Sequence, residues 1–104
     1  MDGGGIVIDT ENKIHSVWNR EGKIFYAQPQ QEEVQIGTGR NCRINGTTKP
    51  VISWKDGPHL KARFLDSAKD ITIGEGSYIE TAELADKKTL CVWENNGKIY
   101  FKSI

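Results

Sequence analysis

The residues best suited to chemistry in this sequence are a tyrosine, a nearby acid and four arginines. Tyr78 lies three residues after Glu75, and a tyrosine beside a carboxylate can serve as the nucleophile of a glycosidase. The arginines could hold the acidic group of a substrate, and they are Arg20, Arg40, Arg43 and Arg63. Because they fall at different places in the chain's internal repeat, and because no serine-hydrolase, phosphate-loop or zinc motif is present, we do not expect an enzyme.

Metal and disulfide chemistry has little support. Cys42 and Cys91 are too few for a disulfide scaffold and lack the paired spacing of a zinc site, so we expect free, buried thiols. Neither His15 nor His59 has a second ligand at helical or hairpin spacing. Residues 45–47, Asn-Gly-Thr, have the form of a glycosylation sequon, but Asn-Gly is also a common turn, and we expect the turn. No metal or other cofactor is expected.

The composition indicates one small domain of balanced charge. The 104 residues include 14 Lys and Arg against 14 Asp and Glu, so no net field draws the protein onto nucleic acid or an anionic membrane. No apolar run approaches the roughly 20 residues needed to cross a bilayer, and residues 1–5 lack the features of a signal peptide. We expect a soluble protein without nucleic-acid or membrane partners, cytoplasmic as the sequence stands and secreted if a leader has been removed.

An internal repeat organises the chain. Trp18, Trp54 and Trp93 recur at intervals of 36 and 39 residues, and the element Ile-Gly-x-Gly recurs after 37 residues. Matching intervals from independent landmarks indicate three copies of one unit within a single domain. The repeats cover about 1–39, 40–76 and 77–104.

Each repeat divides into short runs of β-branched, aromatic and aliphatic residues separated by turn residues, a pattern typical of strands. A glycine follows each tryptophan within four residues, which predicts a tight antiparallel hairpin at that point. We expect no helix. The predicted strands cover residues 6–8, 13–18, 22–26 and 33–39, then 42–44, 50–54, 57–62 and 70–76, then 79–84, 89–93 and 97–101.

Four antiparallel strands in about 40 residues form the blade of a β-propeller. The succession of a Val/Ser-Trp strand, a few turn residues, Gly-Lys-Ile-Tyr/Phe and Ile-Gly-x-Gly resembles the blades of sialidase-like (BNR-type) and related bacterial propellers over nearly the whole chain. The resemblance implies an all-β fragment of about three blades, but no single activity, because propellers host many functions. A β-trefoil, which also has three four-stranded repeats, is the alternative.

The strand order places one group of polar loops on a single face. Because strands alternate in direction, the turns after the tryptophan strands and the loops between repeats emerge together, where binding residues concentrate. The candidate ligand-binding side chains there are Arg20, Arg40, Asp56, Glu75 and Tyr78. We interpret Trp18, Trp54 and Trp93 first as core side chains between sheets, and alternatively as platforms that stack on sugars.

These features favour a non-catalytic, lectin-like module that binds carbohydrate. The alternatives are a protein-interaction or structural module and a remnant of a sialidase-like glycosidase. Propellers have roughly four to eight blades, so three blades cannot close a ring, and the sheet faces exposed at both ends should associate. We expect a homodimer with six blades and two-fold symmetry, and we rank a trimer second.

Overall fold

The chain folds entirely into β-structure. A computed structural model describes residues 3–104, which hold eleven strands. None of the described residues is helical, so this range contains no helix able to cross a membrane. The sequence-based prediction of an all-β, antiparallel protein is confirmed.

The strands form three separate sheets, each built from consecutive antiparallel strands. The first sheet contains β1 (Gly4–Ile8), β2 (Ile14–Arg20), β3 (Lys23–Ala27) and β4 (Val34–Thr38) in that order. The second contains β5 (Arg40–Asn45), β6 (Val51–Asp56), β7 (His59–Phe64) and β8 (Ile71–Glu75) in that order. The third contains β9 (Ser77–Glu83), β10 (Thr89–Asn95) and β11 (Lys98–Ser103), with β10 in the middle.

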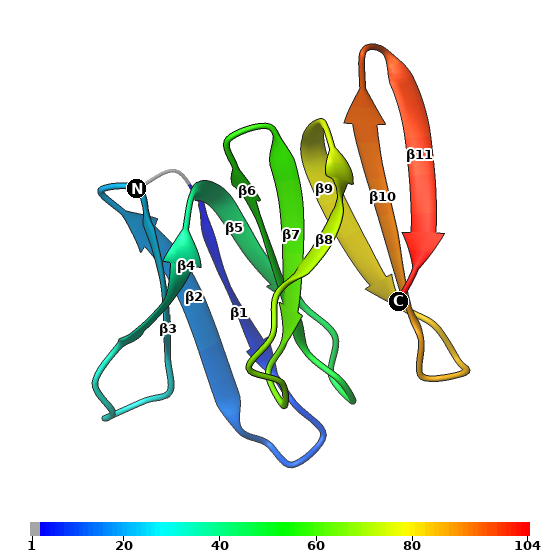
Figure 1. Cartoon of the computed structure of the whole chain (residues 1–104). Coiled ribbons are helices and arrows are strands. Elements are labelled where there is room, and N and C mark those ends of the chain that lie inside the picture. Colours follow the sequence, from blue (N-terminus) through cyan, green and yellow to red (C-terminus); the bar gives the residue numbers. More distant parts are fainter. Residues whose placement is uncertain (1–2) are drawn as a thin grey trace.

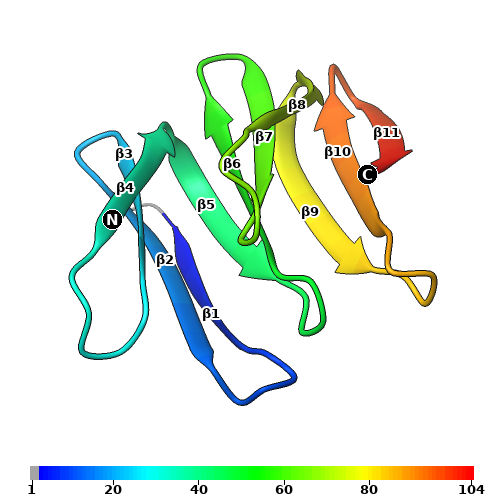
Figure 2. The same cartoon turned by 60° about the horizontal axis from the view of Figure 1, so that its bottom comes forward.

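The sheets stand side by side in chain order, with the second between the other two (Figures 1 and 2). Among the eleven strands of residues 3–104 no sheet closes on itself. The barrel of a trefoil is therefore absent from this part of the chain, and these residues do not form a propeller ring by themselves.

Two apolar layers hold the sheets together. The layer between the first and second sheets contains Val17, Ile24, Cys42, Ile44, Ile52 and Trp54. The layer between the second and third contains Val51, Leu60, Ala62, Phe64, Ile73, Ile79, Cys91 and Trp93. The second sheet contributes to both layers, which explains why four consecutive residues at the start of β6 are buried instead of every second one.

The tryptophans divide according to their neighbours. Trp54 is 1% exposed and packs its indole against Gly37 of the preceding sheet, and Trp93 packs in the same way against Gly74. These contacts place both rings in the core, which was the first interpretation from sequence. Trp18 is half-buried because the side of the first sheet on which it lies faces no other sheet.

Candidate ligand-binding site

One end of the three sheets gathers the turns and loops that the sequence placed on a common face. The β2–β3, β6–β7 and β10–β11 turns and the β4–β5 and β8–β9 connections lie at the upper ends of the three sheets in Figure 1. The hairpin turns there contain glycines with positive φ, Gly22 (75°), Gly57 (60°) and Gly97 (79°), as expected for tight turns.

Strands β5 and β9 begin with the same irregularity at this end. The pairing of β5 with β6 shifts after Arg40, and the pairing of β9 with β10 shifts after Ser77. The residue that follows each of these positions is left-handed, with φ of 58° at Asn41 and 57° at Tyr78. Such bulges turn a side chain out of the ladder and often lie beside binding sites. The repeat thus places Asn41 and Tyr78 at equivalent positions.

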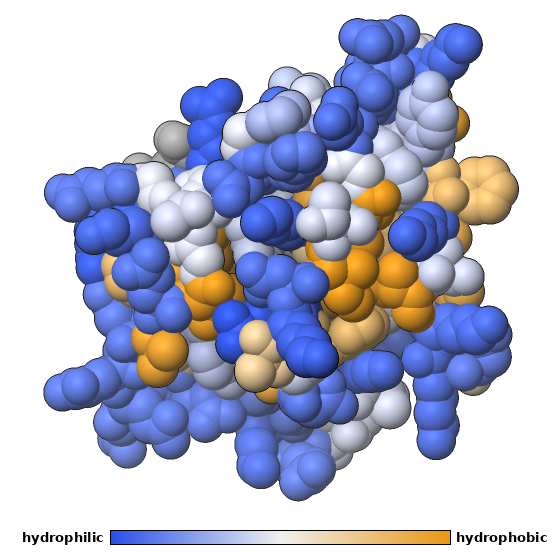
Figure 3. Space-filling view, in the orientation of Figure 1, coloured by the Kyte–Doolittle hydropathy of each residue, from blue (hydrophilic) through white to orange (hydrophobic). Residues whose placement is uncertain are grey.

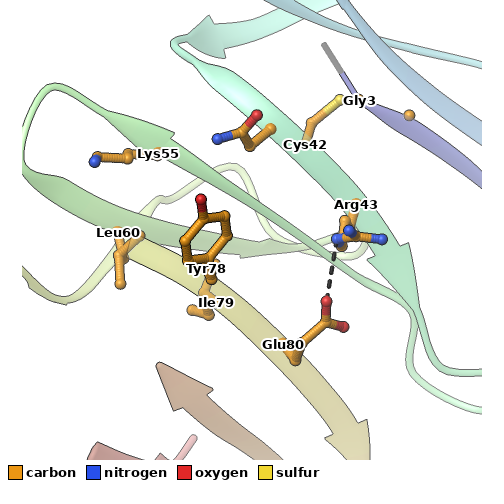
Figure 4. A pocket seen from close by; sticks show the side chains of 10 residues that line it. Gly3, Cys42, Arg43, Lys55, Leu60, Tyr78, Ile79 and Glu80 are labelled. Atoms are coloured by element: carbon orange, nitrogen blue, oxygen red, sulfur yellow. Dashed lines mark ion pairs between the residues drawn. The ribbon is translucent and has the colours of Figure 1, made fainter. Parts of the chain in front are cut away.

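A pocket of about 150 Å³ opens between the two bulges. Tyr78 is 79% exposed, and Figure 4 shows its ring, carried by β9, standing across from Cys42 and Arg43 of β5 with Lys55 and Leu60 to one side. The wall of the pocket therefore combines one aromatic face with charged groups from two sheets.

The charged groups of the pocket link neighbouring sheets. Arg43 Nε lies 3.2 Å from Glu80 Oε1, an exposed ion pair that joins β5 to β9. Lys55 Nζ donates a hydrogen bond of 3.4 Å to Ser77 Oγ. Exposed ion pairs contribute little to stability, so Arg43 and Glu80 can exchange each other for a ligand at small cost.

Cys42 lies at the base of the pocket and is buried. Burial raises the pKa of its thiol to about 11, and burial likewise raises the pKa of Cys91. Both cysteines are free, as predicted. Because the thiolate is the nucleophilic form, Cys42 at neutral pH is part of the packing and not a reactive group.

Of the five polar residues predicted for this face, only Tyr78 lines the pocket. Arg40 borders a neighbouring depression together with Lys55 and Gly57. Glu75 is the last residue of β8.

The other two predicted residues, Arg20 and Asp56, pair with side chains outside the pocket. Arg20 forms an ion pair with Glu33, and its guanidinium carbon lies 4.5 Å from the centre of the Phe25 ring. Asp56 lies 3.5 Å from Lys61 Nζ, and its Oδ2 accepts a hydrogen bond of 3.3 Å from Thr38 Oγ1 of the first sheet. These contacts engage both predicted side chains, and neither residue borders the Tyr78 pocket.

The ligand-binding residues predicted from sequence did not include Arg43, Lys55 or Glu80, although Arg43 was among the arginines considered for holding an acidic group. A signal was present, because Arg43 and Glu80 each lie four residues after the second glycine of an Ile-Gly-x-Gly element and carry opposite charges. The pattern shows that the two residues occupy equivalent positions with opposite charges, but whether their side chains meet depends on how the sheets pack.

His15 forms a second polar cluster near the start of β2. Its Nε2 lies 2.7 Å from Asp9 Oδ2, and its Nδ1 lies 2.7 Å from the hydroxyl of Tyr26. The hydrogen bond with His15 holds the pKa of Asp9 below its ordinary value, and burial raises the pKa of Tyr26. Both ring nitrogens have partners, so this buried histidine has a structural role.

The Tyr78 pocket offers an aromatic face beside amide, guanidinium, carboxylate and ammonium groups. Such a set suits a polar ligand that also has an apolar side. Across residues 3–104, no group of three His, Cys, Asp or Glu side chains is placed to hold a metal ion. Comparisons with models of protein families, with curated proteins and with solved structures find no match to this chain.

Proposed function

We propose that this protein is a non-catalytic module that binds carbohydrate in the pocket beside Tyr78. The observation that carries the proposal is an exposed tyrosine held in a left-handed backbone conformation next to four polar side chains. Bulky residues rarely adopt this conformation, and strained residues cluster at functional sites.

The chemistry of the pocket supports a sugar. A sugar ring has an apolar face, which the Tyr78 ring could stack against, and a rim of hydroxyls, which can pair with Asn41, Arg43 and Glu80. The volume of about 150 Å³ is below the roughly 300–1,000 Å³ of pockets for drug-sized ligands. It suits one ring of a glycan, with the remainder of the glycan outside.

We also infer that the three sheets are blades of a β-propeller of the sialidase-like type. Consecutive strand order within every sheet and the repeated packing of Trp54 on Gly37 and Trp93 on Gly74 support this inference. A propeller gathers the loops of neighbouring blades at one end, which suits a ligand site between β5 and β9.

A glycan array, followed by titration of the hits with tryptophan fluorescence and calorimetry, tests the carbohydrate proposal. Tyr78→Ala and Tyr78→Asn should abolish binding, whereas Tyr78→Phe should retain it because the stacking ring remains. Tyr78→Asn is the sharper variant, because asparagine tolerates the left-handed conformation and is the native residue at the equivalent position 41.

Two comparisons between protein variants control this binding experiment. Arg40→Ala, in the neighbouring depression, should weaken binding less than Tyr78→Asn, and both variants should unfold within about 0.5 kcal/mol of the parent. If no glycan binds, or if Tyr78→Asn binds as the parent does, the carbohydrate proposal is wrong.

Protein interaction is the second candidate, favoured by apolar side chains on the two outer sheets. The first sheet exposes Ile6 and Ile8, and the third exposes Ile99 and Phe101. Exposed apolar surface of this kind is typical of protein contacts. Self-association of the native protein without any glycan binding would favour this candidate over the first.

A further inference from the structure

We propose that the free edge of β11 binds an extended strand from a second polypeptide, in which an acidic residue is followed by Ile-x-Ile-Gly. The proposal concerns the edge of the third sheet and is independent of the ligand pocket. Within residues 3–104, β11 pairs only with β10, whereas the corresponding strands β3 and β7 each pair with a fourth strand.

The two four-stranded sheets provide a template for the strand that β11 would bind. Ile24 lies opposite Gly37 in the first sheet and Leu60 lies opposite Gly74 in the second, and in both the register then shifts by a bulge. Ile99 is the equivalent position in β11, because each of these residues directly precedes the one paired with the tryptophan of its repeat. A fourth strand would therefore place its glycine opposite Ile99.

Strand β11 is exposed along its edge and on its face. Ile24 and Leu60 are buried in the layers between neighbouring sheets, whereas Ile99 is 68% exposed and Phe101 is 77% exposed. A fourth strand would pair with the backbone edge of β11 and pack its own side chains beside Ile99 and Phe101. All six residues of β11 are exposed, including the apolar run 99–101. An apolar edge strand with unpaired backbone groups is a template for strand addition, in which main-chain hydrogen bonds supply much of the affinity.

The positive charge of β11 favours an acidic strand as its partner. Lys98 and Lys102 flank the apolar run, and β11 contains no acid. Lys102 is the counterpart of Arg63, which lies 3.9 Å from Asp70 just before β8. Two antiparallel β11 strands centred on Tyr100 would bring lysine opposite lysine, which is unfavourable, whereas an acidic strand brings opposite charges together.

A synthetic peptide that copies residues 70–76, Asp-Ile-Thr-Ile-Gly-Glu-Gly, tests the proposal. Binding of the fluorescently labelled peptide to the full chain is followed by anisotropy, and its location by amide hydrogen exchange. Saturable binding is expected, with slowed exchange in β11. Two control peptides should bind at least about tenfold more weakly. In one, proline replaces threonine and removes a backbone donor; in the other, lysines replace both acids.

The protein variant Ile99→Glu completes the test, because it removes the apolar side chain and places an acid against the acidic peptide. Because Ile99 is exposed, this variant should unfold like the parent while its affinity for the peptide falls by about tenfold. The proposal is overturned if the parent peptide fails to bind the folded protein. It is also overturned if the proline peptide binds equally well, or if exchange slows at the edge of another strand and not in β11.

Discussion

Gly39 lies so close to the carbonyl group of Lys55 in the next sheet that any Cβ at position 39 would overlap the Lys55 oxygen. Gly76 has the same relationship with the carbonyl oxygen of Glu94. Both glycines also have positive φ, 136° at Gly39 and 148° at Gly76. The second glycine of each Ile-Gly-x-Gly element is therefore required at the point where one sheet passes to the next.

We predict that Gly39→Ala is more destabilising than Gly37→Ala. A Cβ at position 37 would meet the Trp54 ring at 3.0 Å, and a side chain can shift at a cost of about 1–3 kcal/mol, whereas the backbone at Lys55 cannot move alone. Denaturant unfolding measures both. Gly5→Ala is the control, because its Cβ would lie 3.4 Å from Ile44, an ordinary contact. Equal losses in all three variants would contradict the prediction.

Replacing each tryptophan with alanine should distinguish the buried Trp54 from the half-exposed Trp18 by the stability that is lost. Trp54→Ala should lose on the order of 3–5 kcal/mol, much of the stability of a small domain, because the ring fills the layer between two sheets. Trp18→Ala should lose clearly less, because Trp18 is half-exposed and stacks only on Phe25. Chemical denaturation gives both values. If Trp54→Ala unfolded like the parent but lost ligand binding, the ring would be a binding platform after all.

Tyr78→Gly should raise stability while removing binding. The left-handed conformation costs a non-glycine residue roughly 1–2 kcal/mol, which glycine does not lose. Part of this gain is offset because glycine makes the unfolded chain more flexible and so raises its entropy. A net gain of up to about 1 kcal/mol is expected in thermal or denaturant unfolding. Ala82→Gly, at an ordinary position of β9, should lose stability instead. A loss at both positions would show that the Tyr78 ring contributes packing that outweighs the strain.

Glu83 should make stability depend on pH in the acid range. Its carboxylate accepts backbone hydrogen bonds from Thr47 (3.1 Å), Thr48 (3.0 Å) and Lys49 (2.7 Å), tying β9 to the second sheet. Burial raises the pKa of Glu83, but these hydrogen bonds together outweigh burial and hold it below the ordinary value of 4.5. The stability that ionised Glu83 contributes is therefore fully present above pH 4.5 and is lost as the pH falls through the pKa of Glu83 in the folded protein.

Unfolding midpoints measured from pH 7 down to pH 3 test this dependence. Glu83→Gln should be less stable than the parent at neutral pH and should approach it in acid. Glu80→Gln, which removes only an exposed ion pair, should follow the parent profile. If the unfolding midpoint of Glu83→Gln changed with pH in parallel with that of the parent, the hydrogen bonds from the backbone amides of residues 47–49 to Glu83 would not account for the loss of stability in acid.

We predict that the protein forms a homodimer in which the outer face of the first sheet meets the outer face of the third. Trp18 and Phe25 lie half-buried on one of these faces, and Ile99 and Phe101 lie exposed on the other. Light scattering and sedimentation over a wide concentration range measure the mass. A stable, folded monomer at every concentration would contradict the prediction, and a mass three times that of the chain would favour the trimer.

Much of the fold could be predicted from local pattern. Turn glycines and β-branched runs mark strands because they act within a few residues, and the repeat interval then groups the strands into sheets. The core positions of Trp54 and Trp93 also followed, because one large aromatic per repeat suits a gap between sheets.

The sequence by itself therefore determined the strands, their antiparallel order and their grouping into three repeats, since these depend on short-range backbone preferences. Only the tertiary structure decided where the candidate site lies. The left-handed conformations of Asn41 and Tyr78 arise from bulges set by pairing with β6 and β10, and no local pattern marks them. The pairing of Arg43 with Glu80 likewise depends on how one sheet packs against the next. The physical reason is that side chains 37 residues apart in sequence meet only after whole sheets have stacked.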